Sequence, residues 1–187
     1  MIFSGCSITW GDELENQQDR FSTIVSNTIN VTETNISLCG ISNDAIVRRA
    51  VSYNPKEPVI LQLTVPSRME YFTPDGPQKF SLQRQLKMVP YRRPMRTYYT
   101  EVNNEHHQME NLFKNLFVFE QYCYSNNIKH VVLFADCDIE LSHGHWSSLC
   151  KSKIWNIWKD ILGYNHRGGH PTKEEHRKIA NFLLETV

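Results

Sequence analysis

The stretch Gly5–Gly11, GCSITWG, places one serine between two glycines shortly after a three-residue apolar start, Met1–Phe3. A serine at the tip of a strand is exposed and held in place. The backbone N–H groups that follow it can stabilise a negatively charged oxygen. Serine is a weak nucleophile until a neighbouring base removes its proton. Ser7 is therefore a candidate nucleophile; in the alternative interpretation it only caps a helix, and the glycines only shape a turn.

The base that such a serine needs is most often a histidine. His170 stands in GGHPTKEEHRKIANFL, directly before a segment with apolar residues at helical spacing. In a parallel sheet, the segment before the last helix can return to the edge where the first strand ends. His170 is therefore the candidate base for Ser7.

The elements that must position these residues alternate between strand and helix along the chain. The expected strands are 1–3, 35–39, 58–63 and 130–136. The expected helices lie within 12–30, at 42–51 with Ser42 or Asn43 as cap, at 105–126, and at 170–187 with Pro171 in the first position. Strands that are apolar throughout indicate a central parallel sheet covered on both faces. The sequence thus predicts an α/β protein, a three-layer α/β/α sandwich.

Two long stretches interrupt this alternation, at 64–104 and 137–169. Loops of this length commonly act as lids or binding elements; the alternative is a surface excursion or part of an oligomer interface. We expect one domain over 1–187, with both insertions at the sheet edge where the sites of parallel α/β sheets lie. The residues at or just past the expected strand ends are Ser7, Gly40, Thr64 and Asp136 to Asp138.

The composition narrows the class of protein. The 187 residues carry no formal net charge and are 40% hydrophobic, so one core can form, and neither nucleic acid nor a membrane is an expected partner. No apolar run reaches the roughly 18 residues of a membrane span, and the N-terminus lacks the pattern of a signal peptide. Five scattered cysteines without a CxxC pattern favour a reducing compartment. We therefore expect synthesis in the cytoplasm.

Three blocks of the chain resemble motifs of the SGNH (GDSL-type) hydrolases. GCSITWG resembles the first block, whose serine is the nucleophile, with Cys6 where Asp is more usual. NISLCGISNDAIVRR resembles the second block, which points to Gly40, and GGHPTKEEHRKIANFL resembles the last, which points to His170. The resemblance implies a flavodoxin-like fold, a Ser7 nucleophile, a His170 base, and an oxyanion hole formed by the N–H groups of Ser7 and Gly40. Among family members, the chain resembles small ones found in tailed-phage genomes, which implies virion association as an alternative location.

The third block of the family departs from the pattern in this chain. The family normally supplies an asparagine donor just after the third strand, but here the sequence reads QLTVPSRMEYF. Thr64 or Ser67 is the nearest polar substitute, and a hydroxyl can donate one hydrogen bond. The loss of one oxyanion donor typically costs about 10²–10³ in rate.

The acid that orients the histidine is also missing from its usual place. The resemblance implies Asp three residues before His170, where this chain has Arg167. A cation cannot accept the imidazole N–H, and it disfavours the imidazolium. A backbone carbonyl is one substitute, and a dyad without an acid would be slower. The candidate orienting acids are Asp136, Asp138 and Asp160.

The resemblance implies a serine esterase that hydrolyses a small acyl ester, with an O-acetyl group on a carbohydrate as the expected substrate and no cofactor or metal. Asn43, Arg68 and Glu70 are candidate substrate-binding residues, and the last two are alternatively an ion pair. The alternative function is a binding or structural module with weak or no catalysis. Basic and aromatic residues of 64–104 would then bind a glycan or a partner protein. A homo-oligomer or a larger assembly stays open.

A set of histidines raises a third interpretation, a metal site. Its members are His143, His145, His166, His170 and His176, with Cys137 nearby. Their spacing matches no compact zinc pattern. His176 falls on the apolar face of the last expected helix, so we expect it to pack in the core rather than bind a metal.

Overall fold

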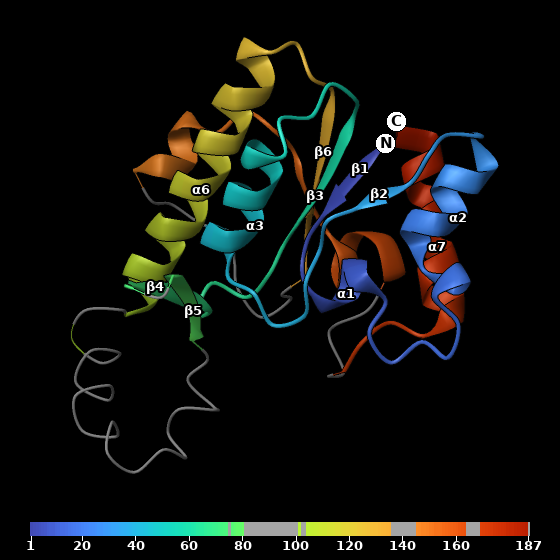
Figure 1. Cartoon of the computed structure of the whole chain (residues 1–187), viewed down its shortest axis with the longest axis horizontal. Coiled ribbons are helices and arrows are strands. Elements are labelled where there is room, and N and C mark those ends of the chain that lie inside the picture. Colours follow the sequence, from blue (N-terminus) through green and yellow to red (C-terminus); the bar gives the residue numbers. More distant parts are fainter. Residues whose placement is uncertain (75, 81–100, 102–103, 136–144, 164–168, 187) are drawn as a thin grey trace.

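The computed structural model describes residues 1–74, 76–80, 101, 104–135, 145–163 and 169–186. Within them, five parallel strands form one sheet in the order β2-β1-β3-β6-β7. The strands are β1 (Ile2–Ser4), β2 (Thr34–Asn35), β3 (Val59–Leu63), β6 (His130–Phe134) and β7 (Ile154–Asn156). Helices lie on both sides of this sheet, which confirms the predicted three-layer α/β sandwich (Figure 1).

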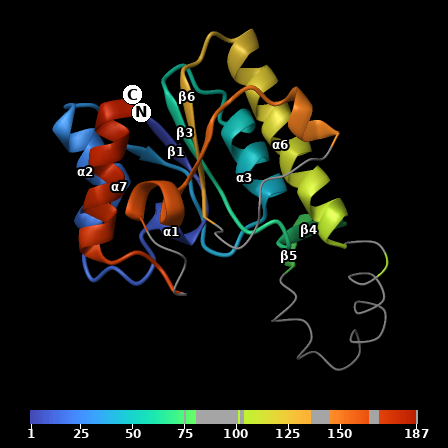
Figure 2. The same cartoon turned by 180° about the vertical axis from the view of Figure 1, so that it is seen from behind.

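Four helices form the two outer layers. One face carries α3 (Asn43–Ser52) and α6 (Glu105–Ser125), and the other carries α2 (Phe21–Thr28) and α7 (Lys173–Thr186), as both views show (Figures 1 and 2). Successive strand residues point to opposite faces, so Leu61 packs in the core under α3 and α6, and Ile60 packs in the core under α2 and α7. All five residues of β3 are buried, which explains why this strand is apolar along nearly its whole length.

Several predicted boundaries need correction. The second strand covers Thr34–Asn35 instead of 35–39, and the helix expected within 12–30 is limited to α2 and a 3₁₀ turn at Gln17–Asp19. The last helix begins at Lys173, so Pro171 precedes it. Thr172 and Glu175 form a capping box there, in which each side chain accepts the backbone N–H of the other. This reciprocal cap outweighs the preference of proline for the first position.

Of the two candidate caps of α3, the structure selects Ser42. Its Oγ accepts the backbone N–H of Ala45 at 3.2 Å. Asn43 becomes the first residue of the helix, and its side chain turns toward the end of β3 instead. The expected helix at 105–126 is confirmed as α6, which begins after the cap Asn104.

The described part of the predicted insertion 137–169 contributes a strand to the central sheet, so it is not an insertion there. It contains β7 and the helical segment Ile157–Leu162. Trp158 of this segment is buried in the core, and its Nε1 donates to the carbonyl oxygen of Ala135 at 3.1 Å. A strand of three residues is too short to show a period in the sequence, which is why it was missed.

A buried carboxylate fixes the entry into β7. Glu120 of α6 has no exposed surface, and it accepts the backbone N–H groups of Lys151 at 3.0 Å and of Ser152 at 2.7 Å. Hydrogen bonds of this charge-assisted kind are about twice as strong as neutral ones. They hold the chain where it approaches the edge of the sheet.

The first predicted insertion, 64–104, begins with a hairpin. Strands β4 (Met69–Thr73) and β5 (Gly76–Phe80) pair antiparallel and form a separate two-stranded sheet. Arg48 of α3 and Glu70 of β4 form a two-pronged ion pair, with Nη2 2.8 Å from Oε2. The hairpin is therefore attached to the outer layer of the sandwich. Residues 81–100 lie outside the described part of the chain.

His176 is packed inside the protein, as predicted. Its ring has no exposed surface and stacks on Phe21, with ring centroids 5.8 Å apart. Its Nδ1 accepts the backbone N–H of Phe21 at 3.2 Å. Burial lowers the pKa of this imidazole to about 4, despite the nearby Glu175. The side chain is therefore a neutral link between α7 and α2.

This buried imidazole should make the protein less stable as the pH falls from about 6.5 to about 4. The unfolded histidine binds a proton near its ordinary pKa of 6.5, whereas the folded protein excludes that proton until about pH 4. Protons therefore favour the unfolded state across this window, by about 3 kcal/mol in total. Urea unfolding of the wild type and of His176→Gln at several pH values measures the effect. The variant should lose less stability than the wild type; parallel losses would contradict the prediction.

Candidate active site

Strand β1 leads directly to Ser7, the first residue of the short helix α1 (Ser7–Trp10). Cys6 occupies the cap position before it, so Ser7 does not act as the helix cap. Gly11 ends α1 in the left-handed region, with φ of 81°, and its N–H returns to the carbonyl oxygen of Ser7 at 3.0 Å. Helix α1 lies at the end of the sheet opposite to the two chain termini (Figure 1).

A buried glutamine of the neighbouring strand β3 supports this turn. Gln62 of β3 has no exposed surface, and its Oε1 accepts from Cys6 N at 3.0 Å, Cys6 Sγ at 3.2 Å and Thr9 Oγ1 at 3.1 Å. A Cβ on Gly5 would lie 2.4 Å from Thr9 Oγ1 and 2.8 Å from Gln62 Oε1, so only glycine fits there. Sequence reasoning missed Gln62. The sequence feature that could have indicated its role is its position as one polar residue inside the apolar run PVILQL.

The structure brings His170 next to Ser7. The distance between His170 Nε2 and Ser7 Oγ is 2.8 Å. A serine hydroxyl that donates to Nε2 leaves the imidazole proton on Nδ1. This Nδ1 is shielded from solvent, and within the described part of the chain it has no hydrogen-bond partner in good alignment. The pair therefore has the geometry of a nucleophile with its base.

Two carboxylates on the loop after α1 face this imidazole. Glu13 Oε1 lies 3.3 Å from His170 Nδ1, although the two groups are not aligned for a hydrogen bond. Asp12 Oδ2 lies 3.9 Å from Nε2, the nitrogen that faces Ser7. No motif pointed to these acids; the only signal was their position directly after Gly11.

The predicted orienting acids have other positions. Asp160 accepts the backbone N–H of Asn156, the cap residue of the helical segment Ile157–Leu162, at 2.8 Å. Its carboxylate is used inside that segment. Asp136 and Asp138 lie outside the described residues, as does Arg167.

The candidate oxyanion donors differ in exposure and in whether their donor groups already make hydrogen bonds. Gly40 is exposed and lies in the left-handed region with φ of 71°. Thr64 is buried, and its N–H donates to Asn43 Oδ1 at 2.8 Å, so only its hydroxyl remains as a donor. That hydroxyl accepts from Arg68 Nη1 at 2.9 Å. Ser67 lies half-buried in the turn between β3 and β4.

The candidate substrate-binding residues have structural roles. Asn43 is buried, and its Nδ2 donates to the carbonyl oxygen of Thr64 at 3.0 Å, so its amide joins α3 to the end of β3. The alternative of an ion pair between Arg68 and Glu70 is wrong, because Glu70 pairs with Arg48. Arg68 is bonded to Thr64 at the root of the hairpin.

The metal interpretation gains nothing from the part of the chain that the structure describes, where no three His, Cys, Asp or Glu side chains are grouped to hold an ion. His145 contacts Trp146 edge-on, with ring centroids 6.1 Å apart. His143, His166 and Cys137 lie outside the described residues. None of the described helices is long and apolar enough to cross a membrane.

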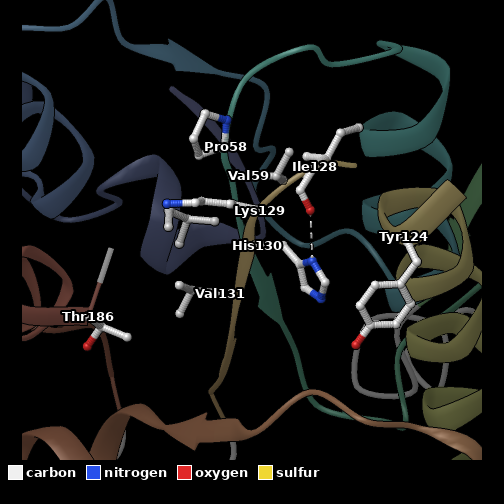
Figure 3. A pocket seen from close by; sticks show the side chains of 9 residues that line it. Pro58, Val59, Tyr124, Ile128, Lys129, His130, Val131 and Thr186 are labelled. Atoms are coloured by element: carbon white, nitrogen blue, oxygen red, sulfur yellow. Dashed lines mark hydrogen bonds between the residues drawn. The ribbon is translucent and has the colours of Figure 1, made fainter. Parts of the chain in front are cut away.

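A hollow of about 400 Å³ lies at the other end of the sheet (Figure 3). It is lined by Pro58, Val59, Ile60, Tyr124, Ile128, Lys129, His130, Val131 and Thr186. These residues surround the amino ends of β3 and β6, whereas Ser7 follows the carboxyl end of β1. The hollow is therefore separate from the Ser7–His170 pair.

Replacement of Gln62 should destabilise the protein and loosen the turn that carries Ser7. In Gln62→Leu, the N–H of Cys6 and the hydroxyl of Thr9 lose their acceptor inside the core, which should cost about 2–4 kcal/mol of stability. Labelling of Ser7 by a fluorophosphonate, a probe for activated serines, should slow as its turn relaxes. Chemical denaturation and labelling rates measure the two effects, with exposed Gln18→Leu as control. Unchanged stability of Gln62→Leu would contradict this role.

Comparison of the sequence with known protein families and with curated proteins finds no match. Comparison of the structure finds lipolytic proteins of the G-D-S-L family and esterases. A member of the lipolytic protein G-D-S-L family from Veillonella parvula matches 98% of this chain over 95% of its own, with 16% identity and a TM-score of 0.52. The psychrotrophic esterase EstA from Pseudoalteromonas sp., in a form inhibited by monoethylphosphonate, matches 98% over 93%, with 14% identity and a TM-score of 0.53. The acetyl xylan esterase AlAXEase matches 100% over 98%, with 15% identity and a TM-score of 0.58. The chain has the fold of the SGNH (GDSL-type) hydrolases.

Proposed function

We propose that this protein is a serine esterase of SGNH type, with Ser7 as nucleophile and His170 as base. The observation that carries the proposal is the 2.8 Å contact between Ser7 Oγ and His170 Nε2. The two residues are 163 positions apart in the chain. They meet at the carboxyl edge of a parallel sheet, where the sites of such sheets lie. Gln62 and Gly5 hold the serine turn rigidly enough for a defined attack geometry.

The first half of the reaction acylates the serine. His170 Nε2 takes the proton of Ser7 Oγ as the oxygen attacks the carbonyl carbon of the ester. The N–H groups of Ser7 and Gly40 hold the resulting oxyanion, with the hydroxyl of Thr64 or Ser67 as the third donor. The carbon–oxygen bond to the alcohol then breaks, and the alcohol leaves with the proton from His170.

The second half of the reaction frees the serine by hydrolysis. A water molecule gives a proton to His170 Nε2 and attacks the acyl carbon. The bond to Ser7 Oγ breaks, Ser7 regains a proton from His170, and the acid leaves. The chemistry needs only these side chains and water.

The preferred substrate is a small acyl ester, with an O-acetyl group on a carbohydrate as first choice. The support is the fold that this chain shares with an acetyl xylan esterase. A fold alone does not determine a substrate, so acetylated carbohydrates are the first substrates to test.

A binding module with weak or no catalysis is the second candidate. One observation favours it: the backbone N–H of Thr64 is used by Asn43, in the region where the family motif supplies an asparagine donor. With one donor fewer, the oxyanion would be held less well, at a cost of about 10²–10³ in rate. The hairpin β4–β5, attached through Arg48 and Glu70, would then belong to the working surface.

Fluorophosphonate labelling distinguishes the two candidates. The probe should label Ser7 in the wild type, not at all in Ser7→Ala, and about 10²–10⁴-fold more slowly in His170→Ala, because the serine then lacks its base. Peptide mapping identifies the labelled residue. Exposed Ser52→Ala and His107→Ala serve as matched controls and should be labelled like the wild type.

Turnover of acetylated xylan fragments and of a simple acetyl ester completes the test. The esterase proposal expects hydrolysis that disappears in Ser7→Ala, while circular dichroism shows an intact fold. Folded wild-type protein that neither reacts with the probe nor releases acetate would refute the proposal and favour the binding module.

A further inference from the structure

We propose that Glu13 is the positioning residue for His170, in place of an acid just before the histidine. The inference rests on the proposed function, because it assigns a partner to the base of that same site. Glu13 lies on the loop that follows α1, six residues after Ser7. Its carboxylate would accept a hydrogen bond from Nδ1–H, hold the imidazole toward Ser7, and stabilise the positive charge that forms when His170 takes the serine proton.

The tautomer of the His170 imidazole leaves an N–H group at Nδ1 that needs a hydrogen-bond acceptor. Ser7 donates to Nε2, so the neutral ring carries its proton on Nδ1. That nitrogen is shielded from solvent and has no aligned hydrogen-bond partner among the described residues, a costly situation for an N–H group. Glu13 Oε1 is 3.3 Å away. A small rotation of the ring or of the Glu13 side chain would align the two groups.

The backbone at Glu13 supports a positioning role. Its φ is 68°, in the left-handed region that residues other than glycine rarely adopt. The loop is held on both sides of it, since Asp12 N donates to the carbonyl oxygen of Ser7 at 3.0 Å and Leu14 N to that of Gly11 at 3.3 Å. The same turn therefore places the nucleophile and the carboxylate, and a strained residue at such a place is typical of functional sites.

The other described groups near His170 are less suited to this role. Asp12 lies 3.9 Å from Nε2, on the side of the ring that already faces Ser7. His176, a further titratable neighbour of His170 among the described residues, is buried and neutral. The sequence between Asp160 and His170 contains no acid. Asp160 itself is bonded to Asn156, the cap residue of the helical segment before that stretch.

The test compares Glu13→Gln, Glu13→Ala and Glu13→Gly in acetyl-ester hydrolysis and fluorophosphonate labelling. Gln keeps an acceptor oxygen but loses the charge, so we expect about a tenfold loss of kcat/KM. Ala and Gly lose both, with about a hundredfold loss. A buried triad acid is worth about 10⁴. The Glu13 side chain is 68% exposed, so water screens it and its effect is smaller. Exposed Glu15→Gln is the matched control and should stay at the wild-type rate.

Glu13→Gly separates positioning from a structural role. Glycine adopts positive φ without strain, so this variant should be at least as resistant to heat as the wild type. A fall in kcat/KM together with an unchanged or higher melting temperature supports the inference. Wild-type kinetics in both Glu13→Ala and Glu13→Gly would overturn it.

The pH profile and NMR give readouts that a purely structural residue would not move. Without the carboxylate, the His170 imidazolium loses a stabilising charge, so the acidic limb of kcat/KM in Glu13→Gln should move to lower pH. NMR titration of the His170 ring nitrogens in wild type and variant should show the same displacement even if the protein hydrolyses no ester. Identical titrations would overturn the role of Glu13, whereas a displaced titration without hydrolysis would refute only the esterase proposal.

Discussion

The contact between the Gln62 amide and the turn from β1 to α1 is the constraint on which the site depends. A three-residue strand cannot by itself hold the chain that follows it. Gln62 supplies the missing rigidity, because one buried oxygen accepts three donors from Cys6 and Thr9. Gly5 is required because a Cβ at this position would collide with the side chains of Thr9 and Gln62. The contacts of Gln62 with Cys6 and Thr9 therefore fix the position of the segment that follows, from Ser7 to the loop with Glu13.

His170, the proposed base, reaches the same place through the opposite end of the chain. The capping box of Thr172 and Glu175 fixes where α7 begins, so His170 falls just before the helix instead of inside it. His176, one turn into α7, then joins that helix to Phe21 of α2 through a buried hydrogen bond and a stacked ring. The distance between Ser7 and His170 is thus set by the packing of α2 and α7 on one face of the sheet.

The sequence predicted those features that have a local or periodic signal. The parallel sheet followed from the apolar runs 58–63 and 130–136, and the pairing of Ser7 with His170 followed from two short motifs. The features that were missed depend on tertiary contacts. Strand β7 forms because Glu120 holds the chain before it. Glu70 pairs with Arg48 instead of Arg68 because α3 lies against the hairpin. No spacing in the sequence encodes either contact.

The placement of polar groups also bears on whether the scaffold retains catalysis. A buried amide with several donors is favourable only when all its partners are present, and an apolar residue would fill the same space with fewer demands. A surface that merely binds a glycan needs no such network under a serine, nor a histidine whose Nδ1 is shielded from water beside a carboxylate. The weakness of the proposed site lies at the proposed oxyanion hole, because Asn43 uses the N–H of Thr64 there. The balance of these groups favours an esterase with a well-held nucleophile and a modest oxyanion hole, since a missing donor slows acyl transfer without removing it.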